Sequence, residues 1–111
     1  MNNIDEKMVA NNLESTYLTH PGEVIKDEIE SRGISQRKLA KEIGVSYSQL
    51  NEVLNGKRPV NTELPLLIEA ALDIPSTPLL TLQTRYDLLS AKRNKSFLTR
   101  LKGIRKIAAA L

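Results

Sequence analysis

The 111-residue chain contains no cysteine and no tryptophan, and His20 is its only histidine. The lack of cysteine excludes disulfides and thiolate metal sites, and one imidazole cannot form a multi-histidine metal centre. No apolar run approaches the roughly 20 residues of a membrane span, and the polar, acidic N-terminus lacks the features of a secretion signal. We therefore expect a cytoplasmic protein with no metal, no cofactor and no membrane partner.

Catalytic groups are also scarce. The sequence shows no nucleophile–base set, no glycine-rich phosphate loop and no pair of carboxylates with a pocket. His20, Glu23 and Asp27 could form an acid–base or metal cluster, but a histidine that caps a helix already has an adequate structural role. We expect no catalytic residues and no enzymatic activity.

Aromatic residues make up only 4% of the chain, whereas 41% is hydrophobic, so the core is expected to be aliphatic. Apolar residues recur at helical spacing in five segments, and no segment reads convincingly as a strand. The sequence therefore predicts an all-α domain of five helices. These are expected from Thr19–Glu23 to Arg32–Gly33, between Ser35 and Gly44, between Ser46 and Asn55, from Asn61 or Thr62 to Leu72, and from about Thr77 to Ser90.

Charge divides the chain into unequal parts. Residues 1–90 hold 9 Lys/Arg and 13 Asp/Glu, whereas residues 91–111 hold seven basic residues and no acidic one. We expect an N-terminal arm at 1–18, a helical domain at 19–90 and a basic tail at 91–111. The overall net charge of +3 thus comes from the tail and is no evidence that the helical domain is basic.

The basic tail has apolar residues at helical spacing from Phe97 to Leu111, although Gly103 weakens a helix by about 1 kcal/mol relative to alanine. Three interpretations remain open. The tail adds nonspecific phosphate contacts, or forms an amphipathic helix on a partner or a membrane surface, or is a disordered end. We favour an ordered helix against a partner or the second copy of a dimer.

Residues 35–58 hold the most specific pattern in the sequence. Ser35 and Ser46 are each placed to cap a short helix, and Gly44 follows the first helix where a left-handed backbone is favoured. The apolar residues of the two helices are Leu39, Ala40 and Ile43, then Leu50, Val53 and Leu54. This spacing is typical of a helix-turn-helix, whose second helix can lie in the major groove of DNA.

The polar side chains of this motif are placed to contact DNA. Side chains near the start of the second helix face base edges, and those at the start of the first helix and in the following loop lie over phosphates. The predicted base contacts are Ser46, Tyr47, Ser48, Gln49, Asn51 and Glu52, and the predicted phosphate contacts are Gln36, Arg37, Asn55, Lys57 and Arg58. A solvated face on a helical bundle is the alternative, but it does not account for two caps, a turn glycine and the Asn-Gly-Lys-Arg loop together.

Residues 19–89 resemble the helix-turn-helix of HigA-type antitoxins, which belong to the XRE (Cro/cI-like, lambda-repressor-like) family. The stretches that carry the resemblance are Thr-His-Pro-Gly-Glu at 19–23, Ser-Gln-Arg-Lys-Leu-Ala at 35–40, Leu-Asn-Gly-Lys-Arg-Pro at 54–59 and Leu-Gln-Thr-Arg-Tyr-Asp-Leu at 82–88. The helix-turn-helix alone indicates only a broad family of repressors. The first and last stretches narrow the resemblance from repressors in general to HigA-type antitoxins.

The sequence departs from this family at three positions. Leu79 stands where a tryptophan is usual, Pro65 replaces a small helix former, and Asp73 replaces a frequent glycine. In the family this region forms the homodimer, so the departures affect dimer geometry more than DNA contacts. The resemblance implies dimer contacts from Leu79, Leu82, Tyr86 and Leu89.

The resemblance implies an antitoxin of a type II toxin–antitoxin pair. Such a protein binds a palindromic operator as a dimeric autorepressor and neutralises a RelE/HigB-like toxin that cleaves mRNA. The acidic residues of 1–30 would complement a basic toxin, although an acidic run is as readily a solvated surface. A stand-alone XRE-family repressor and a protein-interaction module without DNA binding are the alternatives.

Overall fold

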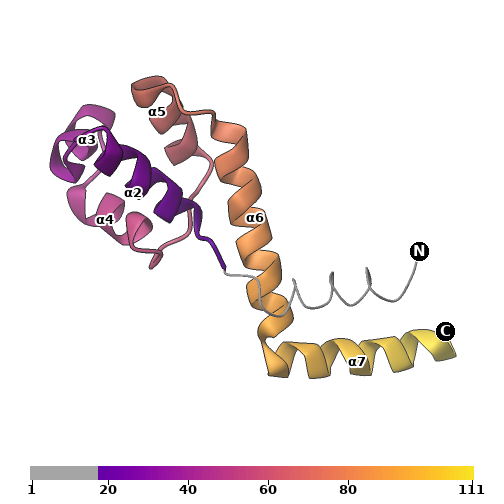
Figure 1. The fold of residues 1–111 in the computed structure, drawn as a ribbon. Helices are drawn as coiled ribbons and strands as arrows, with labels where there is room; N and C mark the ends of the chain where they lie inside the picture. Colours follow the sequence, from indigo (N-terminus) through magenta and orange to yellow (C-terminus); the bar gives the residue numbers. More distant parts are fainter. Residues whose placement is uncertain (1–17) are drawn as a thin grey trace, which may run out of the picture. The chain divides into compact units, whose positions relative to one another are not determined.

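The computed structural model describes residues 18–111, so all of the predicted arm except Leu18 lies outside the described residues. The described part contains helices and no strand (Figure 1). The helices are α2 (Pro21–Ser31), α3 (Gln36–Ile43), α4 (Tyr47–Leu54), α5 (Glu63–Leu72), α6 (Ser76–Arg93) and α7 (Lys95–Ala110). The prediction of an all-α protein is confirmed.

Five helices, α2 to α6, correspond to those expected in the domain at 19–90, and the basic tail forms a further helix, α7, in the described part of the chain. Helix α6 continues to Arg93, three residues past the expected end, and α7 begins after a break at Asn94. The side chain of Asn94 accepts a hydrogen bond from the backbone N–H of Phe97 at 3.0 Å. This cap starts a new helix where one continuous helix could otherwise have formed.

The other helix starts follow the expected capping pattern. Ser35 and Ser46 cap α3 and α4 through their hydroxyls, which accept from Lys38 N and Gln49 N at 3.1 and 3.0 Å. The choice between two caps for α5 falls to Asn61, whose Oδ1 accepts from Leu64 N at 2.9 Å, since Thr62 makes no such bond. Short-range sequence signals thus fix where these helices begin.

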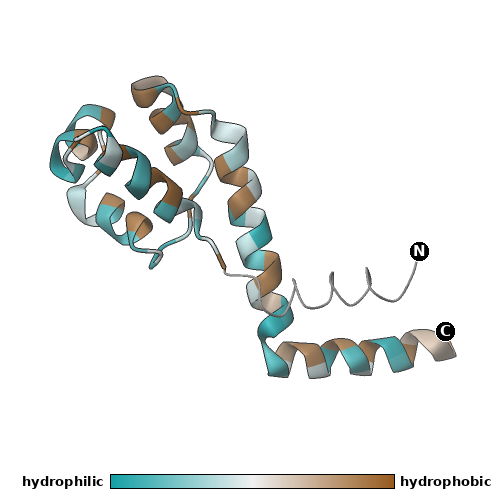
Figure 2. Cartoon of the chain, viewed as in Figure 1, coloured by the Kyte–Doolittle hydropathy of each residue, from teal (hydrophilic) through white to brown (hydrophobic). Residues whose placement is uncertain are grey.

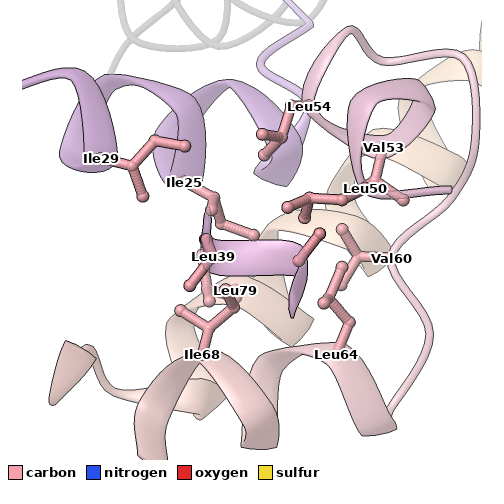
Figure 3. Close-up of a cluster of buried hydrophobic side chains, with 11 residues drawn as sticks. Ile25, Ile29, Leu39, Leu50, Val53, Leu54, Val60, Leu64, Ile68 and Leu79 are labelled. Atoms are coloured by element: carbon pink, nitrogen blue, oxygen red, sulfur yellow. The ribbon is translucent and has the colours of Figure 1, made fainter. Parts of the chain in front are cut away.

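The core lies between α2, α3, α4, α5 and the first turns of α6 (Figure 3). It is aliphatic, as expected, and its residues are Ile25, Ile29, Leu39, Ala40, Leu50, Val53, Leu54, Val60, Leu64, Ile68 and Leu79. Helix α4 packs against both α2 and α3. The helix expected to contact the DNA bases is therefore held in place by its packing against two other helices.

The His-Pro-Gly-Glu stretch forms the start of α2, where it packs on α4. Nδ1 of His20 accepts a hydrogen bond from Gly22 N at 2.9 Å, and Pro21 occupies the first turn. A Cβ on Gly22 would lie only 1.8 Å from the carbonyl oxygen of Val53 at the end of α4. Glycine at this position is therefore what allows the two helices to approach so closely.

The Leu-Gln-x-x-Tyr stretch lies on α6 and packs against the same region. The rings of Tyr86 and His20 meet edge to face with their centroids 5.0 Å apart. Oε1 of Gln83, which is buried, accepts a hydrogen bond from Val60 N at 2.7 Å in the loop before α5. The first and the last of the four stretches that carry the resemblance thus contact each other and join the two ends of one compact unit.

This compact unit comprises Thr19–Tyr86, and Asp87–Leu111 belongs to a second one. The second unit contains the end of α6 and the whole of α7. No helix within residues 18–111 combines the length and the apolar character needed to cross a bilayer.

Candidate nucleic-acid interface

Helices α3 and α4 form a helix-turn-helix through a tight three-residue turn. Gly44 ends α3 in the left-handed conformation with φ of 75°, and Val45 N then donates to the carbonyl of Ala40 at 3.0 Å. The cap at Ser46 starts α4 immediately afterwards. The turn glycine and both caps lie where the sequence predicted them.

The start of α4 is exposed and polar. Tyr47, Ser48 and Gln49 all have exposed side chains, whereas Leu50 behind them is 1% exposed and belongs to the core. The guanidinium of Arg37 lies 4.1 Å from the centroid of the Tyr47 ring, a cation–π contact between the starts of α3 and α4. This brings a predicted phosphate contact and a predicted base contact to the same surface.

A chain of side-chain hydrogen bonds, here called the amide relay, links α2, α4 and α3. Nζ of Lys26 donates to Oδ1 of Asn55 at 3.3 Å, and Nδ2 of Asn55 donates to Oδ1 of Asn51 at 3.1 Å. Nδ2 of Asn51 then donates to Oε1 of Gln36 at 2.9 Å. The relay fixes the orientation of three side chains that the sequence predicted at the DNA surface.

The amide relay changes what Asn51 can do. A bidentate contact with adenine uses both the carbonyl and the amino group of an amide, and both groups of Asn51 are already hydrogen-bonded. Because Oε1 of Gln36 accepts from Asn51, the amino group of Gln36 is the end left to donate to a phosphate. The arrangement favours Asn51 as a positioning residue for Gln36.

Glu52 and Arg58 form an ion pair, with Nη2 of Arg58 2.9 Å from Oε2 of Glu52 and Nε bonded to the same oxygen. Both side chains are about half exposed, so the pair contributes no more than about 1 kcal/mol to stability. The pair does hold the carboxylate of Glu52 against Arg58, a cation that was predicted to contact phosphate. Lys57, in the same loop, is exposed.

Two features of this surface had no clear sequence signal. Lys26 was not expected to take part, because its contact with Asn55 crosses 29 residues and depends on how α2 packs on α4. Glu52 and Arg58 were expected to contact different parts of DNA and are instead paired with each other. Of the predicted base contacts, Ser48 and Gln49 keep exposed side chains.

The predicted dimer residues on α6 do not form one exposed face. Leu79 is 2% exposed and lies in the core, and Leu89 is 5% exposed, whereas Leu82 and Tyr86 are half-buried. Helical spacing identified the apolar residues of α6, but it could not show that Leu79 packs within its own chain. The prediction of Leu79 as a dimer contact is therefore corrected: it fills the core.

Comparison with known proteins agrees with this geometry. The family described as helix-turn-helix matches residues 25–79, which include α3 and α4. Virulence-associated protein I of Dichelobacter nodosus is 32% identical over 77 residues, 68% of this chain and 71% of that protein. Virulence-associated protein A′ of the same organism is 33% identical over 70 residues, 62% of this chain and 61% of that protein.

A solved structure shares the fold. PA4674 of Pseudomonas aeruginosa, crystallised in complex with its 18-base-pair operator DNA, superposes with a TM-score of 0.64 at 26% sequence identity. The likeness covers 72% of this chain and 88% of that one. This likeness, the capped α3–turn–α4 geometry and the sequence relatives lead to one assignment. The chain belongs to the XRE-type helix-turn-helix family.

Proposed function

We propose that this protein is the antitoxin of a type II toxin–antitoxin pair. It binds operator DNA upstream of its own gene as a dimeric repressor, and it neutralises a RelE/HigB-like toxin that cleaves mRNA. Its work is binding, with no enzymatic step.

The observation that carries the DNA-binding part is the surface at the start of α4. Ser48 and Gln49 project from a helix whose other side is buried against α2 and α3. Arg37, Lys57 and the amino group of Gln36 flank them with donors for phosphate. The likeness to a protein crystallised with its operator DNA supports DNA binding by this chain.

The acidic character of α2 supports the toxin-binding part. This helix carries four carboxylates and one lysine, and Asp27 and Glu30 are exposed on it. A toxin that binds RNA presents a basic surface, and opposite charges speed the encounter of two proteins. Lys26, the one cation of α2, is directed toward Asn55 of α4.

Co-expression tests the proposal. The neighbouring gene is expressed in cells with and without this chain, and growth and co-purification are measured. An antitoxin restores growth and co-purifies with the neighbouring product, and the Asp27→Lys/Glu30→Lys variant loses both effects. A chain that never affects growth but binds its upstream DNA is the stand-alone repressor. A chain that neither affects growth nor binds this DNA would be a protein-interaction module without DNA binding.

A further inference from the structure

The basic charge of this protein lies apart from its helix-turn-helix. Residues 19–86, the first compact unit, hold 8 Lys/Arg and 9 Asp/Glu, whereas residues 87–111 hold seven Lys/Arg and one acidic residue, Asp87. Phosphate contacts by lysine and arginine supply most of the nonspecific affinity of a DNA-binding protein. The unit that contains α3 and α4 therefore has no excess of positive charge with which to attract DNA.

The cations predicted to hold phosphate in the first unit are few. Arg58 is held against Glu52 at 2.9 Å, and the guanidinium of Arg37 lies 4.1 Å from the centroid of the Tyr47 ring. Two of the three predicted cations thus already contact a neighbour in the chain, and the third, Lys57, is exposed. We therefore expect part of the attraction to DNA to come from the other unit.

Helix α7 carries five cations, all of them exposed, and no acidic residue. Three of them, here called the lysine row, are Lys95, Lys102 and Lys106. Seven and four residues apart, they lie within about 40° of one another around the helix and extend about 16 Å along it. This length is close to five steps of a DNA strand, whose phosphates follow at about 3.4 Å along the duplex axis.

The surface beside the lysine row is made of short side chains. Helical spacing places Thr99, Gly103 and Ala110 along one side of the row and Ala109 along the other. A Cβ on Gly103 would meet nothing within 4 Å. A phosphate backbone can therefore come close to the helix, so that the three lysines reach it together.

The apolar residues of α7 lie on the side opposite the lysine row. Figure 2 shows hydrophobic and hydrophilic residues alternating along the helix, and Phe97, Leu101 and Ile104 are centred about half a turn from the lysines. A helix that lies on a bilayer buries its apolar face, so the row would point away from the lipid headgroups. A polyanion that needs no apolar contact fits the row better.

We propose that the lysine row of α7 binds the phosphate backbone of the duplex on which α3 and α4 lie. This inference rests on the DNA-binding part of the proposed function. Only eight residues lie between Tyr86, the last residue of the first unit, and Lys95. A cationic group on so short a connection acts at high effective concentration once the first unit is on DNA. The row thus adds affinity for DNA of any sequence, and α4 adds the preference for the operator.

Fluorescence anisotropy tests the lysine row. The protein is titrated into DNA from upstream of its own gene and into a scrambled duplex, between about 50 and about 200 mM NaCl. The row variant is Lys102→Gln/Lys106→Gln. The matched control, Arg100→Gln/Arg105→Gln, removes the same charge from other sides of the same helix. All four side chains are exposed, and circular dichroism checks that α7 stays helical.

The row variant should lower the slope of log K against log salt by about 1.8 on both duplexes, the value for two phosphate contacts. We expect its preference for the upstream DNA to stay as in wild type, because phosphates carry no sequence information. The control should lower the slope by less than about 0.9, the value for one contact.

Three results would overturn the inference. These are a row variant with the wild-type slope, a control that loses as much slope as the row variant, and a row variant that loses affinity for the upstream DNA alone. A protein that does not prefer its upstream DNA, or does not restore growth, contradicts the proposed function instead. The slope on the scrambled duplex depends on neither of these properties, so the two failures are distinguishable.

Discussion

Nδ2 of Asn51 donates a hydrogen bond to Oε1 of Gln36 at 2.9 Å, joining the middle of α4 to the first residue of α3. The bond decides which end of the Gln36 amide faces outward. The amino group of Gln36, which can donate to phosphate oxygens, therefore faces outward. A carbonyl oxygen in its place would be repelled by a phosphate. The surface is thus arranged before DNA arrives, and less order has to be gained on binding.

Replacing Asn51 tests this arrangement. We expect Asn51→Ala to weaken binding to cognate and to scrambled DNA by a similar factor, because it releases Gln36 from its orientation. The loss of one hydrogen bond worth about 1 kcal/mol corresponds to a roughly fivefold weaker affinity for DNA. Fluorescence anisotropy on both DNAs measures it. If Asn51→Ala weakens only the cognate complex, Asn51 reads a base and the positioning role is wrong.

Removing the carboxylate of Glu52 should release Arg58. We expect Glu52→Gln to raise affinity for DNA of any sequence and to steepen the dependence of log K on log salt by about 0.9, the value for one added phosphate contact. Glu30→Gln, which removes the same charge from α2, is the control and should leave the slope unchanged. An unaltered slope for Glu52→Gln would show that Arg58 does not contact phosphate.

The close approach of α2 and α4 makes Gly22 sensitive to the smallest substitution. Gly22→Ala would drive a methyl group into the carbonyl of Val53, and we expect a loss of about 2 kcal/mol or more in the free energy of unfolding. Urea denaturation measures it. Gly103→Ala is the matched control: its Cβ would meet nothing within 4 Å, so α7 should gain about 0.5–1 kcal/mol of helix stability. Equal effects at both positions would refute the packing argument.

Asp73 is the one non-glycine residue of the described chain with a positive φ, 57°, and it ends α5 in the left-handed conformation. A glycine adopts this conformation without steric cost, and the negative charge of Asp73 opposes the helix dipole. We expect Asp73→Gly to raise the midpoint of thermal unfolding, corresponding to about 0.5–1 kcal/mol. Asp73→Ala should lower it. The opposite order would mean that the Asp73 side chain stabilises the turn.

The features that follow from short-range chemistry could be predicted from the sequence. The caps at Ser35 and Ser46, the turn at Gly44 and the apolar core residues of α3 and α4 depend on neighbours within a few residues. The contacts that join distant segments could not. The amide relay, the Glu52–Arg58 pair and the burial of Leu79 depend on how helices pack, and helical spacing alone does not distinguish a buried apolar residue from one that awaits a partner.

Fluorescence anisotropy titrations show whether side chains at the start of α4 recognise the operator sequence. The protein is titrated into DNA from upstream of its own gene and into a scrambled duplex of the same length, with Gln49→Ala in parallel. We expect the wild-type protein to prefer its own sequence by at least about a thousandfold, and Gln49→Ala to lose about 1–3 kcal/mol of binding free energy on that sequence and little on the scrambled one. Equal binding of both duplexes by wild type, or a Gln49→Ala variant that keeps the full preference, would contradict it.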